Sequence, residues 1–159
     1  MRKMLAIGAT KFLIWLGQAM NKQGSSTPGK IGLKIYPNLL KDLAAQVRED
    51  IFVVCGTNGK TTTNNLLCEA LRSEGKKVVC NSAGANMLYG IVTAFADSAS
   101  ISGKLNADCA CIEIDEASAR RAFPHFKPNY MVLTNLFRDQ LDRYGEIDIT
   151  MDVLKEALA

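Results

Sequence analysis

The chain has 159 residues, 48% of them hydrophobic, and its 19 basic and 16 acidic residues leave a net charge of +3. This apolar content is enough for a folded core, and the length fits one α/β domain or a piece of a larger one. The small net charge, without aromatic residues interleaved among basic runs, gives no indication of nucleic-acid binding.

The first segment, residues 4–21, is predicted to be a helix. Lys11 interrupts its apolar residues, and the longest unbroken run is too short to cross a bilayer. Two interpretations stay open: a helix that packs on the domain, or a basic amphipathic helix that rests on a membrane surface. The apolar positions that suggest an amphipathic helix are Leu5, Phe12, Trp15, Leu16 and Met20.

Two further segments precede the first strand. Residues 24–30 are rich in turn-forming residues and are predicted to be a linker or loop. Pro37 is predicted to open a helix that runs to about Val47. We therefore divide the chain into an N-terminal helical segment with its linker, 1–48, and an α/β part, 49–159.

The strongest signal is a glycine-rich loop between a predicted strand, 51–55, and a predicted helix, 61–73. The sequence G-T-N-G-K-T-T-T at 56–63 matches a phosphate-binding loop except that Val54 stands where the general pattern has its first glycine. Backbone N–H groups and the helix N-terminus would surround the phosphates of ATP. Lys60 would contact the β- and γ-phosphates, and the Thr61 hydroxyl would bind Mg²⁺. The residues predicted to bind the nucleotide are Gly56, Thr57, Asn58, Gly59, Lys60, Thr61 and Thr62.

The rest of the chain alternates between predicted strands and helices. A glycine C-cap at Gly75 ends the helix that follows the loop. Such alternation, with apolar strands, predicts an α/β fold with a parallel sheet and helices on both faces. Ligands of these sheets bind at the carboxyl ends of the strands. The remaining elements are expected as strands at 77–80, 109–114 and 130–134, with helices at 88–96, at 116–122 and from about residue 149.

Several polar residues follow these strands and are candidates for the same site. Glu113, near the end of an apolar strand, is predicted to bind Mg²⁺ and to serve in catalysis with Lys60. Asp115 and Glu116 are better explained as caps of the next helix than as functional carboxylates. Asn86 could hold a substrate or metal, or could be an ordinary turn residue.

The charged loop at 135–148 follows the last strand and is predicted to be functional. Its residues Arg138 and Asp139 are expected near the substrate or metal. The cysteines show no C-x-x-C pair, so we interpret all five as buried, reduced thiols of a cytosolic protein. They are Cys55, Cys68, Cys80, Cys109 and Cys111.

Together these motifs resemble the central ATP-binding domain of the Mur ligase superfamily. The matching segments are the loop at 56–63, the I-E-I-D-E run at 112–116 and T-N-L-F-R-D-Q-L-D-R-Y-G at 134–145. Three segments resemble the MurT branch more closely: G-S-S-T-P-G-K-I-G at 24–32, G-A-N-M at 84–87 and the run at 136–148. MurT is the ATP-using subunit of lipid II isoglutaminyl synthase and works with the glutaminase GatD.

The resemblance implies a P-loop ATP site, a GatD-like partner and a lipid II substrate at the inner face of the membrane. The implied reaction is ATP-dependent amidation of the D-glutamate α-carboxylate of lipid II through an acyl phosphate. Gln140 stands where many Mur ligases have a histidine that binds a second metal. Lys155 lies at a plausible spacing for the carbamylated lysine that many of them use.

The same resemblance implies a four-cysteine zinc insertion and a C-terminal domain that this sequence does not contain. The sequence stops inside a predicted helix, so we expect a truncated domain, which would be inactive alone if this were the whole polypeptide. Two other functions remain open: an amino-acid-adding Mur or folylpolyglutamate ligase, and a non-catalytic ATP-binding fragment.

Overall fold

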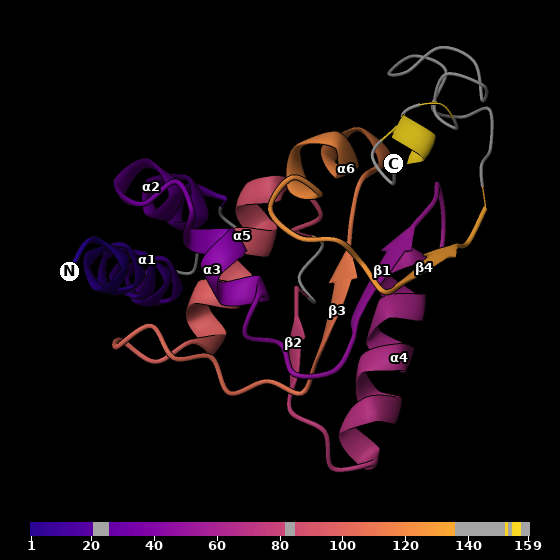
Figure 1. Cartoon of the computed structure of the whole chain (residues 1–159), viewed down its shortest axis with the longest axis horizontal. Coiled ribbons are helices and arrows are strands. Elements are labelled where there is room, and N and C mark those ends of the chain that lie inside the picture. The colour runs from indigo at the N-terminus through magenta and orange to yellow at the C-terminus, as the bar shows by residue number, and fades with distance from the viewer. Residues whose placement is uncertain (21–25, 82–84, 136–151, 153, 157–159) are drawn as a thin grey trace.

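A four-stranded parallel sheet forms the centre of the molecule (Figure 1). The computed structural model describes residues 1–20, 26–81, 85–135, 152 and 154–156. Because all strands run the same way, their carboxyl ends meet at one edge, which confirms the predicted α/β fold. In the spatial order β2-β3-β1-β4, the strands are β2 (Val78–Cys80), β3 (Cys109–Glu113), β1 (Ile51–Cys55) and β4 (Tyr130–Leu133).

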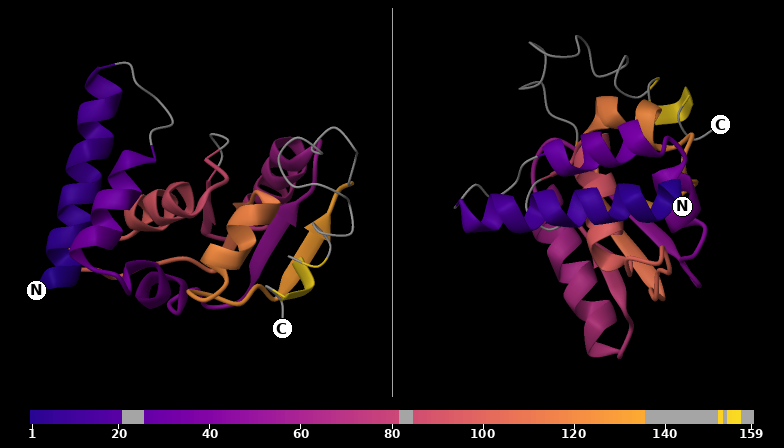
Figure 2. Two further views of the ribbon diagram at one scale, coloured as in Figure 1. Left: turned by 90° about the horizontal axis from the view of Figure 1, so that it is seen from above. Right: turned by 90° about the vertical axis from the view of Figure 1, so that its left-hand side faces the viewer.

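Helices cover both faces of this sheet (Figure 2). Helix α4 (Lys60–Ser73) packs on one face, and α5 (Leu88–Ser98) and α6 (Glu116–Ala122) lie on the other. Side chains alternate along each strand accordingly: Val53 and Ile112 join one core cluster with Phe95 of α5. This central core fixes the positions of the strand ends where the site is built.

Three N-terminal helices extend the layer on the α5 side: α1 (Arg2–Ala19), α2 (Thr27–Ile35) and α3 (Leu39–Ala44). Buried apolar residues of α1 and α3, including Ile7 and Leu40, belong to the same core cluster as the sheet, and Leu33 and Ile35 of α2 pack against it. Helix α1 therefore packs on the domain, as the first of the two interpretations predicted. Among the described residues, no helix has both the length and the apolar character needed to cross a bilayer.

The prediction of a loop at 24–30 is wrong from Thr27 onward, where α2 begins. Pro28 occupies the first turn of α2, where proline is tolerated. Its glycines allow close helix packing and do not form a turn. A Cβ at Gly29 would lie 1.9 Å from the Tyr89 carbonyl oxygen of α5, and a Cβ at Gly32 would lie 2.5 Å from the Thr10 hydroxyl of α1.

Two other predicted boundaries can be compared with the structure. Helix α3 spans only Leu39–Ala44, shorter than predicted from Pro37 to Val47. The glycine C-cap of α4 is confirmed: Gly75 has φ +80°, and its N–H donates to the Arg72 carbonyl at 2.9 Å. The described residues after position 149 include helical ones, and Leu154 is buried in the core.

Candidate active site

The loop between β1 and α4 needs glycine at two positions. Gly56 and Gly59 have φ of +128° and +81°, which disfavour any residue with a Cβ. A Cβ on Gly56 would also lie 2.3 Å from the Thr134 hydroxyl. Gly59 is the N-cap of α4, so the loop turns directly into the helix. The strand, loop and helix thus form the arrangement that phosphate-binding loops use.

The start of α4 offers backbone donors to an anion. The Thr63 N–H is bonded to the Gly59 carbonyl at 2.9 Å, so the helical ladder begins there. The N–H groups of Lys60, Thr61 and Thr62 precede it and have no acceptor within the helix. The N-cap residue, Gly59, has no side chain of its own that could accept from these amides. These amides and the positive end of the helix fit a phosphate group.

Lys60 is folded over the loop that it follows. Its Nζ donates to the carbonyl oxygens of Gly56, at 2.5 Å, and Thr57, at 3.1 Å. The ammonium group is thus held above the loop by acceptors weaker than a phosphate oxygen. A bound triphosphate would compete successfully for it, so this position is compatible with the predicted contact to phosphate.

Thr61 and Glu113 meet although 52 positions separate them in sequence. The Thr61 hydroxyl donates to Glu113 Oε2 at 2.8 Å, and the Asn86 amide donates to Glu113 Oε1 at 3.3 Å. Glu113 is 2% exposed, so this carboxylate is held in place with both oxygens engaged. The structure therefore brings the three predicted residues together.

The donor set fits Mg²⁺ that is shared with a nucleotide. Mg²⁺ in such sites takes one or two carboxylates or hydroxyls from the protein and further oxygens from phosphates and water. Thr61 and Glu113 supply that number. Among the residues that the structure describes, no group of three or more His, Cys, Asp or Glu forms a metal cage.

Asn81, which the sequence reasoning did not single out, fixes the backbone of Glu113. Its side-chain oxygen accepts from the Glu113 N–H at 2.8 Å, and its amide donates to the Glu113 carbonyl at 2.7 Å. Asn81 is 4% exposed and directly follows β2. Its place right after a strand, at the edge where ligands bind, was the signal that could have found it.

Thr134 and Asn135, after β4, bind the phosphate loop, a contact that the sequence reasoning did not predict. The Thr134 hydroxyl donates to the Asn58 carbonyl at 2.8 Å, and the Asn135 carbonyl accepts from the Thr57 N–H at 2.9 Å. The Asn135 side chain makes two more bonds to Asn58. Two loop amides that were predicted to face phosphate, those of Thr57 and Asn58, therefore bind Asn135 in this structure.

Asp115 and Glu116 differ in role. Asp115 is the N-cap of α6, and its carboxylate accepts from the Ala117 N–H at 3.2 Å, as the capping interpretation predicted. Glu116 is 3% exposed, and neither of its carboxylate oxygens has a hydrogen-bond partner among the described residues. Burial raises the pKa of the Cys55 thiol to about 12, and the nearby Glu116 carboxylate contributes to this rise.

Some of the remaining candidates lie outside the described residues. Arg138, Asp139 and Gln140 lie outside them, so their predicted roles are not tested. Lys155 is 71% exposed, and its Nζ lies 3.6 Å from the Asp152 carboxylate. All five cysteines are free thiols; four are buried, and Cys80 is half-buried.

Comparisons with known proteins agree with this geometry. The Mur ligase middle domain matches residues 54–156, which include the glycine loop, Glu113 and the segment after β4. The chain belongs to the Mur ligase family. Its members in this comparison include a lipid II isoglutaminyl synthase (glutamine-hydrolyzing) subunit MurT from Staphylococcus aureus (strain COL), 41% identical over all 159 residues of this chain and 35% of the relative.

Further relatives place the chain within this family. A MurT subunit from Streptococcus pneumoniae is 41% identical over 86% of this chain and 30% of its own length. A UDP-N-acetylmuramate--L-alanine ligase from Nocardioides is 32% identical over 72% of this chain and 23% of its own length. The chain is thus a MurT homologue, and it spans about a third of the length of the MurT relatives it matches.

Proposed function

We propose that this Mur ligase domain binds ATP and Mg²⁺ for amidation of the D-glutamate α-carboxylate of lipid II. The observation that carries the proposal is the contact between Thr61 and Glu113 at the start of α4, in a chain homologous to MurT. The D-glutamate carboxylate would receive the γ-phosphoryl group of ATP with release of ADP and become an acyl phosphate. Ammonia would then displace inorganic phosphate to give D-isoglutamine.

The reaction must bring together two anions, the substrate carboxylate and the phosphates of ATP. The residues of the loop can reduce the repulsion between them. Lys60 and the amides at the start of α4 place positive charge and N–H donors where the phosphates would lie. Mg²⁺, when bound, would neutralise further phosphate charge. Thr61 and Glu113 would hold that ion, and Asn81 and Asn86 keep Glu113 from turning away. None of these groups needs to reorganise during the transfer.

The proposal includes a partner and a cellular location. The relatives are named as subunits of a glutamine-hydrolysing synthase, so we propose that a GatD-like glutaminase supplies the ammonia. The substrate is a membrane-anchored lipid, so we place the protein in the cytoplasm, at the inner face of the membrane.

The test is amidation of lipid II by the protein together with a GatD-type subunit, glutamine, ATP and Mg²⁺. Mass spectrometry distinguishes the product, in which an amino group replaces a hydroxyl. We expect formation of D-isoglutamine when this sequence is joined to the C-terminal part of a MurT relative, and none when the joined protein carries Lys60→Ala, whose fold is checked by circular dichroism. Activity of Lys60→Ala at the parent level would refute the mechanism. In cells, depletion of the protein should shift muropeptides from D-isoglutamine to D-glutamate.

A second candidate is an amino-acid-adding ligase with the same acyl phosphate. The similarity to UDP-N-acetylmuramate--L-alanine ligase favours it, although the identity of 32% is lower than that to MurT. ADP release that depends on an added amino acid, and not on glutamine with a glutaminase, would support this alternative. ATP binding without turnover, even with a GatD-type subunit, would indicate a non-catalytic fragment.

A further inference from the structure

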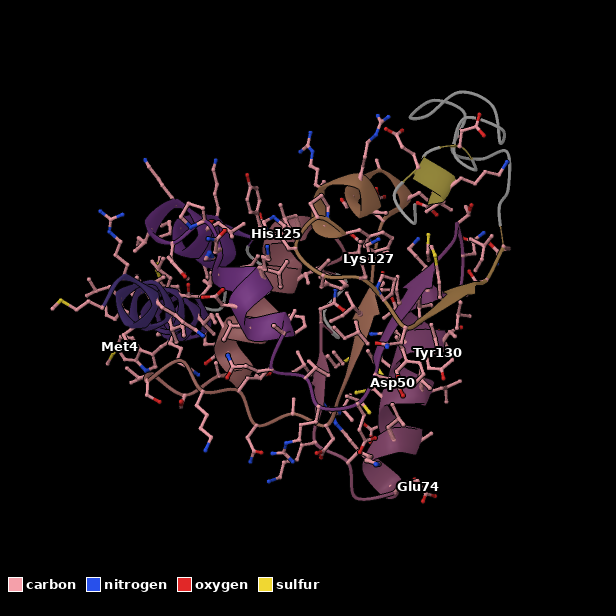
Figure 3. All side chains as sticks on the ribbon, in the orientation of Figure 1. Met4, Asp50, Glu74, His125, Lys127 and Tyr130 are labelled. Carbon is pink, nitrogen blue, oxygen red and sulfur yellow. The ribbon has the colours of Figure 1, made fainter. Side chains whose placement is uncertain are left out.

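Helix α1 has two apolar faces, and only one of them is used in the fold. Ala6, Ile7 and Thr10 are buried on the inner face, where Thr10 donates to the Pro28 carbonyl of α2 at 3.3 Å. The outer face carries large apolar side chains that are exposed. Figure 3 shows Met4 on this outer side, at the edge of the molecule away from β4.

This outer face holds a concentration of exposed apolar surface. Seven of the thirteen large apolar side chains that are exposed in the described part of the chain lie in residues 1–20. Phe12 and Trp15 are 59% and 62% exposed, and their ring centroids lie 6.0 Å apart. An apolar patch of this kind marks a contact surface. Its members are Met1, Met4, Leu5, Phe12, Trp15, Leu16 and Met20.

The N-terminal part of the sequence is rich in basic residues, although Lys11 of α1 lies 3.9 Å from the Asp97 carboxylate of α5. Seven of the 19 basic residues and none of the 16 acidic ones lie in residues 1–41, which therefore carry a formal charge of +7. The rest of the chain has twelve basic and sixteen acidic residues, a charge of −4. Lys30 and Lys34 are exposed on α2, which packs beside α1 (Figure 2).

We propose that α1 rests on the surface of an anionic phospholipid bilayer, with its outer face among the headgroups. A helix with an apolar face, exposed aromatic residues and surrounding Lys and Arg has the composition of interfacial helices. Trp15 supplies a ring of the type that prefers the membrane interface. Each basic residue near the surface adds electrostatic attraction to anionic lipid.

The charge argues against a second copy of the chain as the occupant of this face. A symmetric contact between two α1 helices would bring together two segments that each carry a charge of +7. An anionic lipid surface instead complements both the apolar face and its basic surroundings. The evidence for this contact does not depend on the proposed reaction. If that reaction is correct, the contact would hold the domain near its lipid-linked substrate.

Trp15 makes the test direct because it is the single tryptophan of the chain. The full chain is titrated with vesicles of phosphatidylglycerol and phosphatidylcholine, and the emission of Trp15 is recorded. We expect a blue shift, quenching by lipids brominated on their acyl chains, and weaker binding at high salt. Vesicles of phosphatidylcholine alone should bind at least about tenfold more weakly.

Matched variants distinguish a specific contact of α1 with the membrane from nonspecific adsorption of the protein to vesicles. Leu5→Gln with Phe12→Gln should weaken vesicle binding at least about tenfold while keeping the fluorescent reporter. Leu66→Gln, on α4 and 68% exposed, removes an equally exposed leucine elsewhere and should change nothing. Circular dichroism of all variants confirms that the helices remain folded.

Several results would overturn the proposal. They are an unchanged Trp15 spectrum with anionic vesicles, equal binding to neutral vesicles, and equal loss in Leu66→Gln. Self-association that disappears in the α1 variant, without vesicle binding, would identify a second copy as the occupant. Loss of lipid II amidation with intact vesicle binding would count against the proposed function alone, because the fluorescence assay needs neither ATP nor a glutaminase.

Discussion

The side chain of Asn135 binds both backbone groups of Asn58. Its Oδ1 accepts from the Asn58 N–H at 2.9 Å, and its Nδ2 donates to the Asn58 carbonyl at 2.9 Å. The first residues after β4 are therefore joined to the middle of the phosphate loop. The conformation of the loop depends on a residue 77 positions away and not only on its own glycines.

Removal of the two hydrogen bonds between the Asn135 side chain and the Asn58 backbone should weaken nucleotide binding. Asn135→Ala loses both side-chain bonds to Asn58, so the loop must be ordered when ATP binds. We expect an ATP affinity about tenfold lower, measured by calorimetry in the presence of Mg²⁺. Asn129→Ala is a matched control, because Asn129 Oδ1 accepts from the Ile51 N–H at the opposite end of β4. The idea fails if both variants bind ATP equally well.

Thr61→Val tests the hydroxyl that is predicted to bind Mg²⁺. Valine keeps the shape of threonine but can neither donate to Glu113 nor supply an oxygen to the ion. We expect Mg²⁺-dependent ATP affinity to fall at least about tenfold, while the weaker binding measured in EDTA changes little. Thr63→Val, one position beyond the predicted binding residues, serves as the control. An equal loss of affinity with and without Mg²⁺ would contradict a role at the metal.

The sequence was sufficient to predict the fold, and residues that it placed at one edge of the sheet contact each other in the structure. Strand 51–55 and the helix after the loop were predicted within one residue, because the apolar run and the glycine pattern act locally. Glu113 and Asn86 were placed at the same edge because parallel strands end together. The contact of Glu113 with Thr61 followed from β3 lying beside β1.

Other features depended on contacts that no local pattern contains. Asn81 and Asn135 lie in loops that were predicted at the ligand edge, but their individual contacts were not predicted, because an asparagine after a strand is usually interpreted as a turn residue. Gly29 was interpreted as part of a loop, but it is required by the close approach of Tyr89. Only the packed structure shows whether a glycine serves a turn or a helix contact.

Glu116→Gln should make the domain more stable. A carboxylate that is 3% exposed and has no hydrogen-bond partner among the described residues is costly to bury, and the neutral amide of the same shape costs less. We expect the free energy of unfolding at pH 8 to rise by about 1 kcal/mol, or the melting temperature by roughly 2–4 °C. Glu69→Gln on α4, whose side chain is 69% exposed, is the control and should change stability little. Destabilisation by Glu116→Gln would mean that the charge has a partner beyond the described residues.

The buried thiols predict a loss of stability at alkaline pH. Burial raises the pKa of Cys55, Cys80 and Cys111 to about 12 each, from an ordinary value of 9.0. In the unfolded chain these thiols lose their protons near pH 9, while in the folded protein they keep them until about pH 12. Between these values the folded state binds more protons, so its stability is full below about pH 9 and falls as the pH rises.

Denaturant unfolding at pH 8 and pH 10 measures this effect, and we expect a lower midpoint at pH 10. Replacement of Cys111 by Ala removes one titrating thiol, so the fall in midpoint between the two pH values should be smaller in that variant, whatever its stability at pH 8. Thiol labelling gives a second measurement. At pH 8 the folded protein should react slowly at these buried thiols, because the thiolate is the reactive form, whereas all five cysteines should react in guanidinium. Rapid labelling of all five in the folded protein would show that the sheet opens readily and that burial does not protect them.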